Sequence, residues 1–562
     1  MRWEPPASAR IAGFLLSLCA GLALGRAAPA AGARDLGILG PFYRATQLQG
    51  HLIGMGLMEV PAYLTASHID LKYRAKPGTS REIPFADSFT INRFLGGYRD
   101  DWLQKFHQWD DRLGRRSLDY AIRRSDGSWQ FRPDLIRRRL EPYLAAGYRS
   151  RDITIALENV PWDLATPDGR PPEMGPWGRR TPPGDIEEWS LIVRQFATDL
   201  AAYVGGEASA IQFETGVEYD EKVSFDATAD EFFRYYEATD RALHSVLPDA
   251  VLGPGEFTGL GTCTPNMPHC VYDTGDLLEF AARDQLKITD VPRSLHSFLD
   301  KPANLSPSMT AERAIRSYAR LPQTVPEVHQ FGLLNEPFGN EGSDTAALRG
   351  NWEFQVLLRL WEALRPRRVF HWGGFDTVGR MAFLNGSGFL RLVLDRYIGS
   401  HAYLISPRED GAAGSGSAEL LALGLADRAK TAVIVSSFSP HASDAARPVE
   451  IELPSGMLDG GRPLKSIIRY RQSSNVQARI RADLAADNNL RPDFAGCALC
   501  LATPIQMARD ADRARAMLTR NWESYVEVMK DNLRWRTEDR GIARDGTVLR
   551  VTLEPNELVL IE

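Results

Sequence analysis

Two carboxylates, Glu214 and Glu218, lie in the stretch Ile211–Asp220, which reads I-Q-F-E-T-G-V-E-Y-D. An apolar run leads into them, and a helical pattern with an N-terminal capping box follows from about Thr228 to Leu247. A second strand-like run, Val251–Gly255, comes next. The carboxylates are therefore expected at the C-terminal end of a strand in a strand–helix–strand unit, where parallel α/β folds usually place their chemistry.

A further carboxylate, Glu336, ends another strand-like run in the sequence H-Q-F-G-L-L-N-E-P-F-G. Carboxylates at the ends of different strands of one barrel can face each other, whereas neighbours on one strand cannot. Such a pair can divide the work of acid and nucleophile between them. For each carboxylate taken alone, the alternative is an ordinary loop residue.

The region around Glu218 resembles retaining glycoside hydrolases of clan A, and most closely glycoside hydrolase family 39, which includes the β-xylosidases and α-L-iduronidase. The family reads F-E-x-W-N-E-P where this chain has F-E-T-G-V-E-Y over residues 213–219. The resemblance implies that Glu218 is the general acid/base. Gly216 and Val217 replace the family's Trp-Asn, so the Asn that binds the sugar hydroxyl next to the reacting carbon is absent.

The resemblance also suggests a nucleophile. In the iduronidase branch it lies in an N-D-E-A-D-P segment at the seventh strand, and Asn335-Glu336-Pro337 is similar to that segment. The same residues also resemble the clan's acid/base motif. Strand counting decides between the two roles, because Glu218 follows the fourth predicted strand and Glu336 the seventh. We therefore expect Glu336 as the nucleophile, with the two carboxyl groups ~5–5.5 Å apart as in retaining glycosidases.

Further residues match family positions that contact the sugar. Arg93 matches the Arg of the family's first strand, although Leu95 replaces the His expected two residues later. His296 ends the sixth predicted strand, where the family keeps a His or Tyr. Phe298 stands where the iduronidase branch has a uronate-binding Lys, which argues against an iduronic acid substrate. Candidates for contact with the sugar are Arg93, Trp162, Glu214, His296, Asn335, Trp372 and Phe375, and weaker ones are Glu158, Asn159 and Glu256. Packing in the core is the alternative for the histidine and the aromatic residues.

Strand-like runs alternate with helical ones over a long part of the chain. The eight predicted strands are Phe89–Phe94, Leu118–Arg123, Ile153–Glu158, Ala210–Thr215, Val251–Gly255, Arg293–Phe298, His329–Leu334 and Val369–Gly374. The helix Asp185–Val204 between two of them is amphipathic, with Asp185 and Glu188 placed for a cap. Eight strands in alternation with helices predict an α/β fold, a (β/α)8 TIM barrel over residues 86–400.

After about Ser400 the pattern changes to short strands with alternating apolar residues. These runs are Thr431–Ser439, Pro448–Pro454, Lys465–Gln472, Val548–Glu554 and Leu558–Glu562. They predict an accessory β-sandwich domain over residues 401–562, interrupted by a helical, charged stretch at Ala508–Trp535. In the iduronidase relatives an N-terminal segment adds strands to this sandwich. We therefore expect residues 34–85, and His68–Ala75 in particular, to join it.

Residues 1–33 have the pattern of a secretory signal peptide. Arg2 and Arg10 precede the apolar run Ile11–Leu24, and an Ala-rich run follows it. The apolar run is shorter than the ~20 residues that a transmembrane helix needs, so an uncleaved anchor is only the alternative. We expect a periplasmic or secreted protein with no stable membrane span after signal cleavage.

Four cysteines lie beyond the signal sequence. Cys263 and Cys270 bracket a short Pro-rich loop and are expected to form a disulfide in an exported protein. Cys497 and Cys500 form a CxxC pair that is expected to make a second one. A redox pair, a zinc site and free thiols are the alternatives, but the pair lacks a thioredoxin-like context and no second CxxC completes a zinc set.

Composition and motifs exclude several classes of function. The net charge is −6, with 66 Lys+Arg against 72 Asp+Glu, and nothing suggests a nucleic-acid partner. No Gly-rich phosphate loop precedes a helix, no residues have metal-ligand spacing, and chemistry by two carboxylates needs no cofactor. With the resemblance, these observations favour an exported retaining glycosidase that hydrolyses a polysaccharide or oligosaccharide. The alternatives are an inactive barrel that binds glycans, which Val217 favours, and a transglycosylase.

Overall fold

The structure is a computed structural model of the chain. It describes residues 33–39, 45–49, 88–92, 94–97, 112–114, 116–145, 148–164, 174–175, 178–255, 257–258, 268–286, 293–298, 305–319, 326–334, 346–371, 375–378, 381–384, 386–409, 419–427, 430–439, 445–457, 464, 466–471, 476–488, 490, 509–532, 534, 536–537, 542–545 and 547–562.

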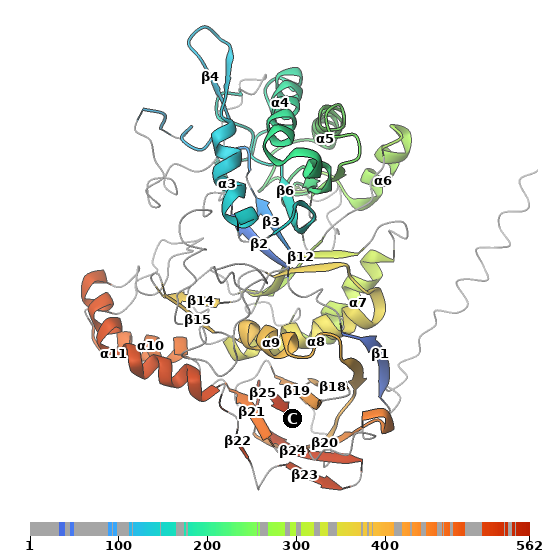
Figure 1. The fold of residues 1–562 in the computed structure, drawn as a ribbon, viewed down its shortest axis with the longest axis vertical. Coiled ribbons are helices and arrows are strands. Elements are labelled where there is room, and N and C mark those ends of the chain that lie inside the picture. The colour runs from blue at the N-terminus through green and yellow to red at the C-terminus, as the bar shows by residue number, and fades with distance from the viewer. Residues whose placement is uncertain are drawn as a thin grey trace, which may run out of the picture.

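An eight-stranded parallel sheet forms one of the two main sheets of the molecule (Figure 1). Its strands are β2 (Ala45–Gln49), β3 (Ser88–Asn92), β6 (Ile153–Ala156), β9 (Gln212–Glu214), β10 (Val251–Gly253), β11 (Arg293–Phe298), β12 (Glu327–Leu334) and β13 (Arg368–His371). They lie side by side in the order β10-β9-β6-β3-β2-β13-β12-β11. Because β13 pairs with β2, the eighth strand meets the first, which is the circular order of a (β/α)8 barrel. The described residues form no ladder between β10 and β11.

A contact across the sheet shows that the sheet is strongly curved. Arg367, just before β13, donates from Nη2 to Gln212 Oε1 at the start of β9, at 2.9 Å. Arg368 binds the same oxygen, and both arginines contact Glu327 Oε1 at 2.6 Å at the start of β12. Four strand spacings of ~4.8 Å would hold β9 and β13 about 19 Å apart in a flat sheet, beyond the reach of these side chains. The sheet therefore curls so that the starts of its fourth and eighth strands meet.

A helix follows each strand of this sheet from β3 onward. These helices are α3 (Pro133–Ala145), α4 (Ile186–Val204), α5 (Ala229–His244), α6 (Thr274–Arg283), α7 (Pro307–Tyr318), α8 (Ala346–Leu364) and α9 (Gly386–Asp395). The predicted caps are confirmed, since Asp185 accepts from two backbone N–H groups of α4 and Thr228 forms a capping box with Glu231 in α5. The predicted apolar face of α4, which includes Trp189 and Phe196, is buried.

Of the first two predicted strands, one is present but is second in the order, and the other is not part of the parallel sheet. Phe89–Phe94 corresponds to β3, but β3 is the second strand because β2 precedes it in the sheet. The barrel order thus takes in residues 45–49, before the predicted boundary at residue 86. Within Leu118–Arg123, β4 (Ala121–Arg123) instead pairs antiparallel with β5 (Trp129–Phe131) in a hairpin. One strand was missed and one was added, so β9 remains the fourth strand and β12 the seventh.

The C-terminal part contains two antiparallel sheets. The seven-stranded sheet has the order β1-β16-β18-β19-β25-β21-β22, and the four-stranded sheet has the order β17-β20-β24-β23. The first comprises β1 (Arg34–Ile38), β16 (His401–Ile405), β18 (Glu419–Ala426), β19 (Thr431–Phe438), β25 (Leu558–Ile561), β21 (Ser466–Tyr470) and β22 (Arg536–Thr537). The second comprises β17 (Arg408–Glu409), β20 (Arg447–Glu452), β24 (Val548–Leu553) and β23 (Ile542–Asp545). Of the segment 34–85 that was expected to join the sandwich, β1 pairs with β16 here, whereas β2 lies in the parallel sheet. His68–Ala75 lies outside the described residues.

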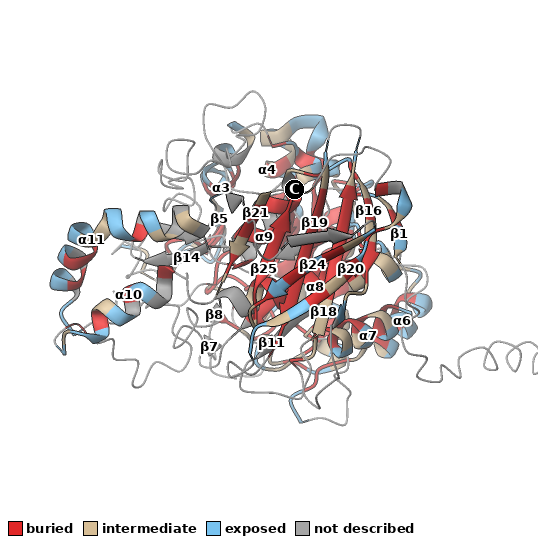
Figure 2. Ribbon diagram, turned by 90° about the horizontal axis from the view of Figure 1, so that it is seen from below, coloured by how far each residue is buried: buried red, intermediate tan, exposed pale blue. Residues whose placement is uncertain are grey.

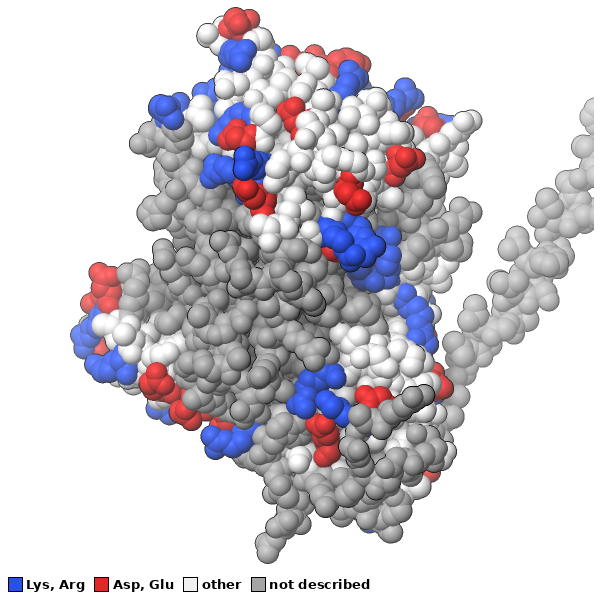
Figure 3. Space-filling model, in the orientation of Figure 1, with Lys and Arg blue, Asp and Glu red and all other residues white. Residues whose placement is uncertain are grey.

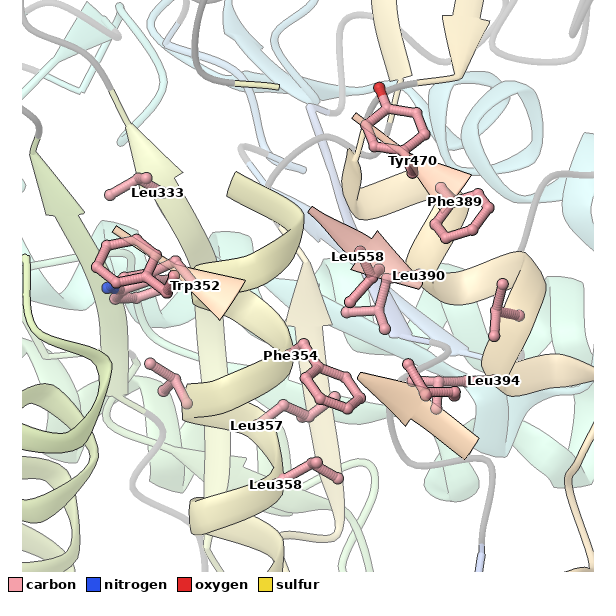
Figure 4. Close-up of a cluster of buried hydrophobic side chains, with 14 of the residues drawn as sticks. Leu333, Trp352, Phe354, Leu357, Leu358, Phe389, Leu390, Leu394, Tyr470 and Leu558 are labelled. Atoms are coloured by element: carbon pink, nitrogen blue, oxygen red, sulfur yellow. The ribbon is translucent and has the colours of Figure 1, made fainter. Parts of the chain in front are cut away.

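The central strands β18, β19 and β25 of the seven-stranded sheet are buried on both faces (Figure 2). One face, with Val433 and Val435, packs on the four-stranded sheet, and the other, with Ile434, packs on α8 and α9. Figure 4 shows this second cluster, in which Phe354 of α8 and Leu390 of α9 lie near Leu558 of β25. The seven-stranded sheet therefore shares one apolar cluster with α8 and α9 of the parallel-sheet part.

Two further helices, α10 (Val476–Ala485) and α11 (Ala511–Asn532), pack on each other between β21 and β22 in the chain. The second confirms the predicted helical stretch. On the described part of the face seen in Figure 3, acidic and basic side chains are interspersed. No helix within the described ranges is both long and apolar enough to cross a bilayer.

Candidate active site

The candidate site lies at the C-terminal ends of β6, β9 and β10. Glu214 is the last residue of β9 and is 1% exposed, whereas Glu218, in the turn that follows, is partly exposed. Glu158 and Asn159 follow β6 and are both buried. Of these carboxylates, Glu218 is the one that the described structure leaves open to solvent, so it is the best placed to exchange a proton with a ligand.

Glu218 has a left-handed backbone conformation, with φ 57°. This region is uncommon for residues other than glycine and costs about 1–3 kcal/mol. The turn is closed by the Glu221 N–H, which donates to the Glu218 carbonyl oxygen at 3.1 Å. Asn159, at the end of the neighbouring strand, also has a positive φ of 60°. Strained backbone of this kind persists only where the surroundings hold it, and it often marks a functional turn.

Two glycines make the turn before Glu218 possible. A Cβ atom at Gly216 would overlap the Tyr219 ring, and one at Gly255, after β10, would overlap the Gly216 carbonyl oxygen. Gly255 also has a φ of 97°. The position at which family 39 has Trp therefore has no room for a side chain here. Val217, which replaces the family's Asn, is 5% exposed.

Tyr219 and Asp220 fix the turn to the loops on either side. The Tyr219 hydroxyl accepts the Asn159 N–H at 2.9 Å, and its ring stacks on Phe225 with centroids 4.3 Å apart. Asp220 is fully buried and accepts the Thr258 N–H at 2.9 Å and the Thr258 hydroxyl at 3.1 Å. Burial raises the pKa of Asp220 to about 8, and the nearby Glu218 carboxylate adds to the shift.

Helix α5 contacts the C-terminal ends of the strands through the side chain of Tyr235. The Tyr235 hydroxyl donates to the Leu157 carbonyl at 2.6 Å and lies 3.0 Å from the Thr215 carbonyl. Thr215 Oγ1 in turn donates to the Pro254 carbonyl at 2.5 Å. Tyr235 is buried, which raises its pKa well above the ordinary value and keeps the hydroxyl as a donor. These hydrogen bonds connect the C-terminal ends of β6, β9 and β10 to one another.

The loop after β6 is held by Asp119. Its two carboxylate oxygens accept the N–H groups of Gly97 and Trp162, each at 2.8 Å, and burial raises the pKa of Asp119 to about 7. Arg179 donates to the Trp162 carbonyl at 2.9 Å. The Trp162 ring is 9% exposed, so most of its surface contacts protein. Its predicted contact with a sugar stays a prediction.

The structure describes only part of the predicted site. Glu214, Glu218 and Trp162 are among the described residues. For His296 only the backbone is described, and it lies in β11 opposite Gly332 of β12. Arg93, Asn335, Glu336, Trp372 and Glu256 lie outside the described residues. Strand β12 ends at Leu334, just before Glu336 in the sequence. The pairing of Glu218 with Glu336 therefore stays a prediction.

Two residues of the turn, and a third in the loop beside it, were not predicted from the sequence. Tyr219 and Asp220 directly follow Glu218, and their residue types could have marked them. A buried tyrosine or aspartate beside a catalytic motif usually makes a hydrogen bond to a neighbouring group. Thr258 offered none, because its role depends on the loop after β10 lying beside the turn after β9.

The predicted disulfides are not tested. Cys270, the one cysteine among the described residues, is buried and is not a free thiol. Cys263, Cys497 and Cys500 lie outside the described residues, so both pairings remain predictions. Within the part of the chain that is described, no three His, Cys, Asp or Glu side chains gather in a way that could hold a metal ion.

Comparison with known proteins shows similarity in fold only. No protein-family model matches the sequence, and no curated protein matches it. The GH39 enzyme from Xanthomonas axonopodis pv. citri is similar in structure, with a TM-score of 0.59 and 14% identity, over 94% of this chain and 95% of that one. A monomeric β-xylosidase from Caulobacter crescentus CB15 has the same TM-score of 0.59 and identity of 14%, over 94% and 97%. A bacterial orthologue of human α-L-iduronidase follows with a TM-score of 0.51 and 10% identity, over 94% and 82%. The chain thus shares the fold of these glycoside hydrolases.

Proposed function

We propose that this protein is an exported retaining glycosidase, similar to family 39, that hydrolyses glycosidic bonds of a polysaccharide or oligosaccharide. The observation that carries the proposal is Glu218, partly exposed in a left-handed turn at the C-terminal end of β9, the fourth strand in barrel order. Glu336 comes just after β12, the seventh strand. The shared fold with glycoside hydrolases supports the same activity.

The mechanism assigns one role to each carboxyl group. Protonated Glu218 donates its proton to the leaving oxygen while the Glu336 carboxylate attacks the anomeric carbon, which gives a covalent glycosyl-enzyme. The Glu218 carboxylate then takes a proton from water, and that water displaces Glu336. Partial exposure suits Glu218 to this double role, because its proton is exchanged with a leaving group and then with water.

Export is part of the proposal. It rests on the signal-like pattern of residues 1–33 and on the four cysteines beyond it, and it implies a periplasmic or secreted location. Mass spectrometry of the exported protein is expected to show cleavage before the barrel and bonds between Cys263 and Cys270 and between Cys497 and Cys500. Free thiols at all four positions, or an intact residue 1–33 segment, would contradict this part.

The activity is tested with Glu218→Gln and Glu336→Gln on a panel of 4-nitrophenyl glycosides. Each change is expected to lower kcat/KM by a factor of about 10²–10⁴, the usual contribution of a positioned acid, or more for the nucleophile. Azide should rescue Glu218→Ala with a product of retained configuration and Glu336→Ala with a product of inverted configuration. Circular dichroism checks that the variants are folded. Wild-type turnover in both Gln variants would remove these two residues from the mechanism.

The alternative is a barrel that binds glycans without cleaving them, and Val217 favours it. Val cannot donate the amide hydrogen bond that the family's Asn makes, and such bonds contribute several kcal/mol in the transition state. If the protein is an enzyme whose activity Val217 merely lowers, Val217→Asn should raise its turnover. If another group makes that contact, the change should leave turnover flat or lower it. Glycan binding with no turnover in either protein would support the binding alternative.

A further inference from the structure

Asp220 lies directly beyond the turn that presents Glu218, and its carboxyl group is directed into the protein. It is 0% exposed, and both of its oxygens lie within 3.1 Å of the Thr258 N–H, with the Thr258 hydroxyl also 3.1 Å from Oδ1. Its backbone carbonyl accepts the Val271 N–H at 2.8 Å. Thr258 follows β10 and Val271 precedes α6. Asp220 thus joins the Glu218 turn to two segments of the neighbouring β10–α6 unit.

The other side of the turn is joined to β6. The Tyr219 hydroxyl accepts the Asn159 N–H, and the Gly216 backbone is packed directly against Gly255. Glu218 therefore stands between two anchored neighbours, and its own backbone is in a region that a residue with a side chain rarely adopts. Such a conformation relaxes toward negative φ unless its neighbours hold it, and that relaxation would turn the Cα–Cβ bond of Glu218 in a new direction.

The environment of Asp220 is unfavourable for a charge. Burial raises the pKa of its carboxyl group, the Glu218 and Glu221 carboxylates raise it further, and the bonds from Thr258 oppose the shift. A buried carboxyl group that is held by hydrogen bonds costs free energy which an apolar residue would not. The presence of Asp220 beside Glu218 is explained if the geometry of the turn depends on it.

We propose that Asp220 is a positioning residue for proton transfer, which holds the Glu218 turn through Thr258 so that the Glu218 carboxyl group is directed at the leaving oxygen. This inference rests on the proposed function, because it needs Glu218 to be the acid. A small displacement of an acid slows its proton transfer while leaving the attack of the nucleophile unchanged. The effect of losing Asp220 should therefore depend on how much the leaving group needs a proton.

The test uses two glycosides of the sugar that the wild type cleaves fastest in the 4-nitrophenyl panel. The phenyl glycoside needs a proton on its leaving oxygen, and the 2,4-dinitrophenyl glycoside does not. Asp220→Ala is expected to lower kcat/KM for the phenyl glycoside by about 10–100-fold, a part of the full acid contribution, and for the dinitrophenyl glycoside by less than about threefold. Asp220→Asn keeps one acceptor oxygen for the Thr258 N–H and should restore most of the lost rate.

Asp119 provides the matched control. It is also fully buried, accepts two backbone N–H groups, and has a raised pKa, but it anchors the loop after β6 and not the turn of Glu218. Asp119→Ala is expected to affect both glycosides by similar factors. If Asp220→Ala also lowers both rates equally, Asp220 is merely structural and the inference is overturned. If Asp220→Ala does not fold, Thr258→Val removes the hydroxyl that donates to Asp220 but keeps the backbone N–H, and it should show the same dependence on the leaving group to a smaller extent.

The outcomes also separate this inference from the proposed function. If Glu218→Gln slows the phenyl glycoside far more than the dinitrophenyl one and Asp220→Ala does not, only the inference about Asp220 fails. If Glu218→Gln shows no such dependence, Glu218 is not the acid and the proposed mechanism fails. If the wild type cleaves no glycoside of the panel, both are overturned.

Discussion

Glu218 combines the side chain of the proposed acid with a backbone conformation that favours glycine. Its φ of 57° carries a cost that the turn must offset through its neighbours. Stability and activity are therefore expected to conflict at this residue. A replacement that relieves the strain should make the fold more stable while it removes the proposed acid.

We predict that Glu218→Gly raises the free energy of unfolding by about 1 kcal/mol relative to Glu218→Ala, because only glycine adopts this φ without a steric penalty. Both variants lack the carboxyl group, so the comparison isolates the backbone. Urea denaturation followed by tryptophan fluorescence measures the difference. Equal stability of the two variants would show that the turn is not strained.

The sequence predicted the carboxylates of this turn but not its shape. Glu214 and Glu218 could be recognised because they follow a strand and match a family motif. Gly216 was seen only as a departure from that motif, and the reason for it, the Tyr219 ring in the space above it, depends on packing. The contact of Asp220 with Thr258 joins loops from two strands, so no local pattern could reveal it.

Among the elements, long strand–helix repeats could be predicted and short strands could not. Strands β9 to β13 and helices α4 and α5 follow their predicted positions, since apolar periodicity and caps mark them. Strand β2 reads A-T-Q-L-Q, with little apolar character, and it was missed. Leu118–Arg123 does contain a strand, but its sequence does not show whether the partner is a barrel strand or the nearby β5. Pairing is a tertiary property.

The bonds that join β9, β12 and β13 make a second prediction. Glu327 is fully buried and contacts both Arg367 and Arg368 at 2.6 Å. Glu327→Ala leaves two guanidinium groups without their shared carboxylate at the start of the strands, which should lower the free energy of unfolding by about 3 kcal/mol. Chemical denaturation measures this change, and a loss below about 1 kcal/mol would contradict it.

A matched control for this prediction is Glu312→Ala. Glu312 pairs with Arg316 one turn along α7 at 2.7 Å, and both side chains are 64% exposed. Because exposed pairs of this kind contribute little, its loss should change the free energy of unfolding by less than about 0.5 kcal/mol.

The whole molecule is expected to unfold as one unit, because the seven-stranded sheet packs on α8 and α9 as well as on the four-stranded sheet. Ile434 lies in the cluster with the helices, and Ile451 lies between the two sheets. We predict that Ile434→Ala and Ile451→Ala each lower the free energy of unfolding by about 2–5 kcal/mol and shift the same single transition in calorimetry. Two separate transitions, with Ile451→Ala moving only one of them, would show that the sandwich unfolds alone.

The position of β25 has a consequence for synthesis on the ribosome. This strand lies between β19 and β21 in the interior of the seven-stranded sheet, although Leu558–Ile561 comes after every other described strand in the sequence. Until these residues leave the exit tunnel, β19 and β21 each lack a neighbour, and open strand edges of this kind invite pairing with other chains. A nascent chain that stalls before Leu558 should therefore be bound by chaperones and proteases as an unfolded protein, however complete its barrel is.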